Sequence, residues 1–186
     1  MKFTPLLQTD ALLVEPVVHA DARGSFARAW CARTFAAQGI DFQPVQGNTS
    51  FTRRRGTVRG MHFQRAPMAD AKLVRCTRGA IHDVLVDLRE DSPTRGAVLS
   101  AELSAGNGAM LYAPAGFAHG FQTLDDDTVV EYLMGAEYEP SLYDGFRHDD
   151  PALAIAWPLP VTVLSQGDAA WRPLAARMPW LLGAQA

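Results

Sequence analysis

The chain has 186 residues, of which 48% are apolar and 20% are charged, as expected for a globular domain and not for a disordered chain. The net charge of −3 favours neither nucleic acid nor an anionic membrane as a partner, and no apolar run is long enough for a membrane span. Cys31 and Cys76 form no CxxC motif, and residues 1–16 make a poor signal peptide. We therefore expect a single cytoplasmic domain over residues 1–186.

Arginine dominates the basic residues. Of the 17 basic residues 15 are arginines, and the two lysines are Lys2 and Lys72. A GC-rich genome explains such a bias, and most of the arginines are expected on the surface. Lys72 is nevertheless the one lysine away from the terminus, and its compact charge is not reproduced by the planar fork of arginine.

The first expected element is a helix over residues 26–37, an alanine-rich segment that ends at Gly39. Short segments rich in β-branched and aromatic residues follow it, separated by turn-forming residues. These expected strands cover residues 42–51, 57–64, 72–77, 80–88, 97–103, 109–113, 117–124 and 128–134. Many short strands at this spacing predict an all-β protein, an antiparallel jelly roll with a few short helices. The segment from Tyr138 is expected to wrap over the barrel as strand and helix.

Several kinds of chemistry find little support in the motifs. The histidines are His19, His62, His82, His119 and His148, and they form neither an HxH pair nor an HExxH motif. A metal site of two histidines from distant strands stays open, but we expect no metal. No GxSxG elbow, P-loop or GxGxxG motif is present, which argues against the commonest serine nucleophiles and nucleotide cradles.

Polar residues on consecutive expected strands suggest proton transfer instead. They are Gln46, Asn48, Arg59, His62, Gln64, Lys72, Asp83, His119 and Tyr132. Because alternate residues of a barrel strand face the lumen, part of this set can converge on one cavity. Arg59 and His62 are three positions apart, so they share a face only if Gly60 forms a bulge. A histidine base, a tyrosine acid and a lysine cation suit removal and return of a proton beside a carbonyl. Taken singly, each residue is more often a surface or packing residue.

Longer motifs carry a family resemblance. The two most specific are Val58-Arg59-Gly60-Met61-His62-Phe63-Gln64 and Pro114-Ala115-Gly116-Phe117-Ala118-His119-Gly120-Phe121. Around them, in order, stand residues 21–26, 46–50, 72–76, 83–89, 92–94, 149–151 and 164–168. Together these segments resemble the dTDP-4-dehydrorhamnose 3,5-epimerase family from about residue 10 to residue 175. The resemblance implies a cupin-like jelly roll without a cofactor, a homodimer, and a nucleotide-diphosphate sugar, a 4-keto-6-deoxyhexose, as substrate.

The resemblance also implies four catalytic residues. His62 matches the base, and Asp168 matches the carboxylate that orients it and makes it more basic. Tyr132 matches the acid on the opposite face of the sugar, and Lys72 matches the cation beside the C4 oxygen, where the enolate charge forms. Inversion needs a base and an acid on opposite faces of the ring, so two different groups are required.

Further matches concern substrate binding. They are Arg23, Phe26, Arg28, Gln46, Asn48, Arg59, His119, Tyr138 and Tyr143. Arginines suit bidentate contacts to a diphosphate. Arg28 and Tyr143 stand where the family usually has glutamate, which leaves the nucleotide and the sugar open. Whether Arg23 serves its own site or that of the partner subunit is also open.

The leading hypothesis is epimerisation at C3, C5 or both of a nucleotide-linked, dTDP-type, 4-keto-6-deoxyhexose in rhamnose-type deoxysugar and lipopolysaccharide biosynthesis. One alternative is an epimerase that inverts C3 alone on a different nucleotide sugar. Another is a non-catalytic sugar-nucleotide binding protein of the same fold, and a third is a metal-dependent jelly-roll oxygenase.

Overall fold

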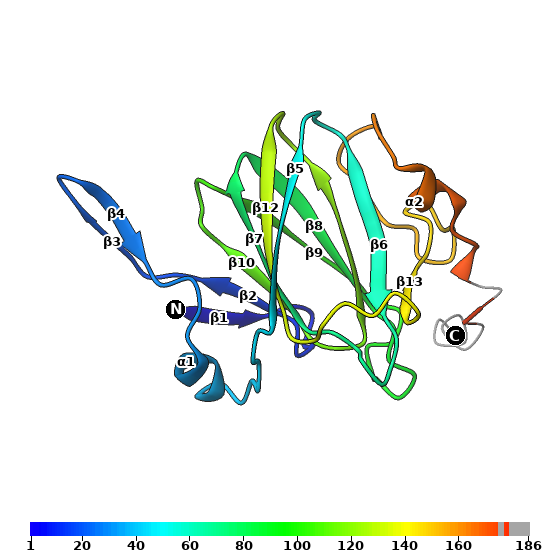
Figure 1. The fold of residues 1–186 in the computed structure, drawn as a ribbon, viewed down its shortest axis with the longest axis horizontal. Coiled ribbons are helices and arrows are strands. Elements are labelled where there is room, and N and C mark those ends of the chain that lie inside the picture. The colour runs from blue at the N-terminus through cyan, green and yellow to red at the C-terminus, as the bar shows by residue number, and fades with distance from the viewer. Residues whose placement is uncertain (175–176, 179–186) are drawn as a thin grey trace.

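Two antiparallel sheets stack face to face in the computed structural model, which describes residues 1–174 and 177–178 (Figure 1). The strand orders are β1-β2-β10-β7-β12-β5 and β13-β6-β11-β8-β9, and β3 and β4 form a separate hairpin. The strands are β1 Lys2–Pro5, β2 Leu12–Glu15, β3 Val18–Asp21, β4 Gly24–Ala27, β5 Gln46–Thr52, β6 Val58–Gln64, β7 Lys72–Arg78, β8 Ala80–Asp87, β9 Val98–Ser104, β10 Met110–Ala113, β11 Phe117–Thr123, β12 Thr128–Met134 and β13 Tyr143–Gly145. The predicted all-β jelly-roll class is confirmed. The predicted domain continues to Ala186, and its residues 175–176 and 179–186 lie outside the described residues.

The eight strands predicted between residues 42 and 134 are all present, as β5 to β12. The largest difference is at β5, which begins at Gln46 and not at Phe42. Phe42 is buried against the rings of Phe35 and Tyr112, so its apolar character reflects packing and not a strand. Strands β1 to β4 were not predicted, and each has only four residues, too few for a clear alternating pattern. Strand β13 has three residues and lies in the segment from Tyr138, where a strand was expected without bounds.

The predicted helix over residues 26–37 is wrong in its first half. Helix α1 covers only Ala32–Ala36, and Phe26 lies in β4, which pairs with β3. Turn chemistry explains the difference: Asp21 accepts a hydrogen bond from the Arg23 N–H, and Gly24 has a φ of 129°, so the chain reverses into a hairpin. This local turn overrides the helix propensity of the alanines that follow.

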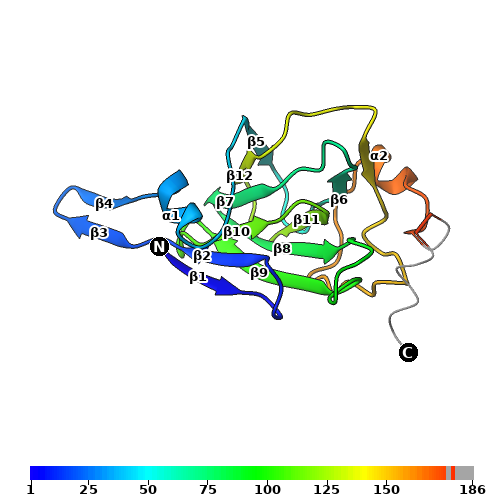
Figure 2. The same cartoon turned by 90° about the horizontal axis from the view of Figure 1, so that it is seen from below.

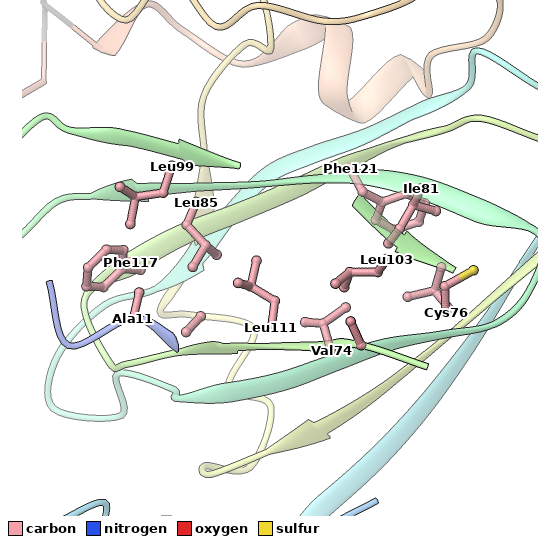
Figure 3. Close-up of a cluster of buried hydrophobic side chains, with 13 residues drawn as sticks. Ala11, Val74, Cys76, Ile81, Leu85, Leu99, Leu103, Leu111, Phe117 and Phe121 are labelled. Carbon is pink, nitrogen blue, oxygen red and sulfur yellow. The ribbon is translucent and has the colours of Figure 1, made fainter. Parts of the chain in front are cut away.

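Apolar side chains fill the space between the sheets at one end (Figure 3). There β7 and β10 of one sheet face β8 and β9 of the other, and buried residues such as Val74, Leu85, Leu103 and Leu111 pack together. At the other end β5 and β12 face β6 and β13, and polar side chains line a cavity instead. The apolar end holds the two sheets together, and the polar end forms the cavity of a candidate functional site.

The C-terminal segment covers the outer face of the five-stranded sheet, as predicted. Phe146, Leu153 and Leu174 of this segment pack on Met61 of β6 and Val84 of β8. The segment then forms helix α2, Gln166–Ala170, which lies beside β6 (Figures 1 and 2). This packing brings α2 to the edge of the cavity. No helix within the described residues is long and apolar enough to cross a membrane.

Candidate active site

A cavity of about 600 Å³ opens between β5, β6, β7, β11 and β12, with α2 at its rim. This volume lies within the usual range for small-molecule sites. Eight of the predicted site residues line it: Asn48, Arg59, His62, Lys72, His119, Tyr132, Tyr143 and Asp168. Residues up to 120 positions apart in sequence therefore meet in one place. Six of the eight belong to the polar set on expected strands that was predicted to converge in part, and the other two, Tyr143 and Asp168, were implied by the family resemblance.

The predicted bulge at Gly60 is confirmed. Between the pairs His62↔His119 and Arg59↔Phe121, β6 advances three residues while β11 advances two. Gly60 has a φ of 124°, and a Cβ on it would lie 2.6 Å from the Gly120 Cα. The extra residue turns both Arg59 and His62 into the cavity.

His62 and Asp168 form a close pair. His62 Nε2 donates to Asp168 Oδ1 over 2.6 Å, and the two side chains are 26% and 9% exposed. Burial raises the pKa of the Asp168 carboxyl, but the hydrogen bonds from the His62 ring and from the Gly60 N–H outweigh it and hold the pKa below its usual value. The carboxylate is thus ionised and fixes Nε2 as the donor nitrogen, which leaves Nδ1 as the acceptor.

Helix α2 places this carboxylate. Its N-cap is Ser165, whose hydroxyl accepts the Asp168 N–H over 2.9 Å. Three residues after Asp168, Trp171 lies with its ring centre 6.5 Å from that of His62. The Tyr143 ring lies 5.3 Å from His62 and 6.2 Å from Trp171. Two aromatic rings therefore flank the histidine and limit the positions its ring can take.

Tyr132 enters the cavity from the opposite sheet. It lies on β12, and its hydroxyl is 3.3 Å from Ser50 Oγ in hydrogen-bond contact. Burial raises the pKa of the Tyr132 phenol, and the Ser50 hydroxyl offsets only part of this rise. The phenol therefore keeps its proton at neutral pH. A neutral acid on one sheet thus faces a histidine base on the other.

Lys72 belongs to the same sheet face as Tyr132. The strand register pairs Lys72 with Met134, two residues along β12 from Tyr132, and pairs Tyr132 with Asn48 on β5. Side chains two apart on a strand point the same way, so all four face the cavity. The Lys72 side chain is 8% exposed and lies 3.4 Å from the Asp70 carboxylate. The cavity thus contains a buried cation.

His119 forms a second histidine–carboxylate pair on the five-stranded sheet. Its Nε2 donates to Asp83 Oδ1 over 2.6 Å, and both side chains are buried. The His119 ring lies 5.9 Å from that of Tyr132, edge to face. The His119 ring on one sheet and the Tyr132 ring on the other are therefore in contact at the wall of the cavity. Asp83 itself does not line the cavity, so it orients His119 from behind.

The other predicted residues lie elsewhere. Gln46 and Tyr138 line a neighbouring cavity of about 130 Å³, in which Lys72, Asn48 and Tyr143 also take part. Arg23 and Phe26 lie on the β3–β4 hairpin, which points away from the body of the protein (Figures 1 and 2). Arg28 lines a separate pocket beside β7 and β10. The structure therefore does not bring these three residues to the cavity of their own chain.

Sequence reasoning missed several residues that belong to the site. Ser50 and Trp171 line the cavity, and Asp70 contacts Lys72. Two of them had a detectable signal in their spacing. Trp171 is three residues after Asp168, at the C-cap of α2, and Asp70 is two residues before Lys72, just ahead of β7.

Residues 1–174 and 177–178 contain no group of three or more His, Cys, Asp or Glu side chains that could hold a metal ion. The four polar groups that converge on the cavity are instead a histidine–aspartate pair, a neutral phenol, a lysine and a second histidine pair. Such a set can remove a proton, stabilise a negative oxygen and return a proton from the other side.

Comparison with known proteins decides the family. The sequence profile of the family described as dTDP-4-dehydrorhamnose 3,5-epimerase matches residues 6–176. The chain belongs to this family. A curated dTDP-4-dehydrorhamnose 3,5-epimerase from Sinorhizobium fredii is 46% identical over 180 residues, which cover 96% of this chain and 92% of that protein. The family consists of isomerases, so the protein is an enzyme of that class.

Two solved structures of this family are close in fold. One is the dTDP-6-deoxy-D-glucose-3,5-epimerase of Legionella pneumophila in complex with dTDP-4-keto-L-rhamnose, with a TM-score of 0.86, 34% identity and 96% coverage of both chains. The other is ChmJ, a 3'-monoepimerase from Streptomyces bikiniensis in complex with dTDP-quinovose, with a TM-score of 0.85, 35% identity, and coverage of 95% of this chain and 90% of that one. Double and single epimerases are thus about equally similar to this chain.

Proposed function

We propose that this protein inverts C3 and C5 of a dTDP-linked 4-keto-6-deoxyhexose, in deoxysugar biosynthesis of the rhamnose type. The observation that carries the proposal is the opposition of His62 and Tyr132 across one cavity, with Lys72 beside them. A protein that only binds a sugar nucleotide needs no base opposed to an acid. The dTDP-sugars bound by the two related structures support the choice of nucleotide.

In the proposed mechanism His62 Nδ1 takes the proton from the carbon next to the C4 ketone, and the bonding electrons move to the C4 oxygen. Lys72 stabilises the resulting enolate, whose charge would otherwise make the carbon far too weak an acid. Tyr132 then donates its proton to the same carbon from the other face, which inverts that carbon. His62 has gained one proton and Tyr132 has lost one, and both are restored by exchange with water.

Deuterium incorporation tests this proposal. The protein is incubated in D₂O with dTDP-4-keto-6-deoxyglucose, and the sugar is examined by NMR and mass spectrometry. We expect deuterium at both C3 and C5, because each inversion delivers a solvent-derived proton from Tyr132 to carbon. Deuterium at C3 alone would identify a single epimerase instead. If neither C3 nor C5 exchanges, with the dTDP-sugar or with its UDP- and GDP-linked analogues, the proposed activity is contradicted.

We further propose a homodimer in which the β3–β4 hairpin of each copy reaches the other copy's cavity. Every residue of both strands is exposed, and Phe26 is 72% exposed at one end of the molecule. An isolated two-stranded hairpin is only marginally stable in water, so it needs a surface to pack on. Its Arg23 has only Asp21 as a polar side-chain partner among the described residues and is open to a diphosphate.

Subunit mixing distinguishes the two possible locations of Arg23. The variants Arg23→Glu and His62→Ala are expected to be inactive when each is alone. Mixed after unfolding and refolding, they are expected to recover about a quarter of wild-type exchange, because random pairing makes half of the dimers mixed and each mixed dimer has one intact site. If Arg23 serves its own chain, the mixture stays inactive.

The single domain over residues 1–186 and the cytoplasmic location are part of the same proposal. Both cysteines are free thiols, with Cys76 buried and Cys31 half-buried. Free thiols fit a reducing compartment.

A further inference from the structure

Asp70 is a buried carboxylate next to Lys72 that no part of the mechanism above uses. Its Oδ2 lies 3.4 Å from Lys72 Nζ, and the two side chains are only 7% and 8% exposed. It stands two residues before Lys72, and the Gly135 N–H donates to the Ala71 carbonyl between them. That hydrogen bond extends the β7–β12 ladder past the start of β7, so Asp70 and Lys72 point to the same side of the sheet.

The carboxylate of Asp70 has no other polar partner in the described part of the chain. It accepts no hydrogen bond from residues 1–174 or 177–178, and its ion pair with Lys72 is its one polar side-chain contact there. Asp87 is a useful contrast, because it is also buried but accepts hydrogen bonds from Arg89, Ser92 and Thr94. Asp87 holds a loop together, whereas the contacts of Asp70 give it no comparable structural task.

The contact also leaves the donors of Lys72 available. Among the described residues the Lys72 ammonium donates no hydrogen bond, so Asp70 contributes negative charge without taking up an N–H. Lys72 lines both the 600 Å³ cavity and the 130 Å³ cavity, while Asp70 lines only the smaller one. The Lys72 ammonium therefore lies between the two cavities, and the Asp70 carboxylate lies on the side away from the main cavity.

Burial makes this arrangement important. An ammonium removed from water is strongly disfavoured unless an opposite charge compensates it. A substrate in the main cavity would displace the remaining water around Lys72. With less water nearby, the ammonium depends more on a fixed opposite charge for its stability and its position beside the enolate oxygen.

We propose that Asp70 is the positioning residue of Lys72: its carboxylate compensates the buried ammonium charge in the occupied site and aims the Lys72 N–H groups into the main cavity. The inference rests on the proposed function, because it assigns Asp70 a task in stabilising the enolate. Asp70 itself does not touch the main cavity, so substrate binding does not depend on it directly.

The first test is Asp70→Asn, which removes the charge and keeps the shape. We expect kcat for deuterium exchange to fall by roughly 10- to 100-fold, as for other groups that support a catalytic residue from behind, while KM and the affinity for dTDP stay unchanged. Glu137→Gln is the matched control, since Glu137 is an exposed carboxylate on the same small cavity. That variant is expected to keep wild-type exchange.

The second test is chemical rescue. Asp70→Ala joins the space of the lost carboxylate to the 130 Å³ cavity, which gives room for a formate ion beside Lys72. Sodium formate is expected to restore part of the lost exchange, while the same concentration of sodium chloride does not. In a Lys72→Met background, Asp70→Asn is expected to cause no further loss, because the two residues act through one interaction.

The outcomes separate the two levels of the proposal. Wild-type protein that exchanges no deuterium overturns the proposed function and this inference with it. Active wild-type protein with equally active Asp70→Asn overturns only the role of Asp70. Loss of dTDP binding in both Asp70 variants, with no response to formate, would show that Asp70 is a structural carboxylate and would also overturn the inference.

Discussion

Replacing His62 with alanine is expected to lower deuterium exchange at C3 and at C5 together by ~10³-fold, within the usual range for removal of a general base. One histidine is held by Asp168 in one cavity, so both proton abstractions depend on the same nitrogen. Binding of dTDP is expected to be largely unchanged, because the proposed nucleotide contacts are with other residues. Exchange is measured by NMR in D₂O, and dTDP binding by calorimetry.

His82→Ala is the matched control for this variant. His82 lies on β8 but packs against Trp157 on the outer face, away from the cavity. Its replacement is expected to leave exchange at the wild-type rate. If His62→Ala weakens dTDP binding as much as it slows exchange, His62 is a ligand contact and the assignment of the base is wrong.

Lys72→Arg is expected to lower turnover by ~10²-fold although the formal charge is unchanged, comparable to the loss of one donor that stabilises an oxyanion. The Lys72 side chain is 8% exposed and close to Asp70, so there is little room for a larger head group. A planar guanidinium spreads the charge and cannot place it at the point where a compact ammonium does. Steady-state kinetics with the ketosugar measure the loss.

The chain offers a natural control, since Lys2 is its other lysine. Lys2 is exposed and pairs with Glu15, and Lys2→Arg keeps that surface pair. This variant is expected to be as active as the wild type. Wild-type turnover in Lys72→Arg would mean that any cation suffices at this position, and the specific role of the ammonium would have to be abandoned.

Most of the fold could be predicted because its strands are regular and separated by clear turns. The segments from β5 to β12 have β-branched and aromatic residues bounded by glycine, proline or aspartate, and all eight were predicted. The hairpin of β3 and β4 was missed because its strands are exposed on both faces and show no apolar alternation. The helix predicted across Phe26 failed because propensity is a weak guide beside a strong turn.

Part of the site could be predicted in the same way. The spacing of Arg59 and His62 required a bulge, and the Gly60 bulge is present. The family resemblance pointed to Asp168, which composition and periodicity alone would have left as a surface carboxylate. Asp70 and Trp171 were missed because a short spacing to Lys72 and to Asp168 is too weak a signal to mark a residue of the site. Only the folded chain shows that the Asp70 carboxylate before β7 lies against Lys72 and that the Trp171 indole after α2 lies beside His62.

The sequence by itself determined the strand pattern, the need for a bulge in β6, and the family with its four candidate catalytic groups, because these depend on local spacing and on residue identity. The tertiary structure alone decided which of these groups meet. His62 and Asp168 are 106 residues apart, and their contact depends on the C-terminal segment packing over the five-stranded sheet. The tertiary structure also decided that Lys72 is a buried cation paired with Asp70, since burial arises only when distant strands come together.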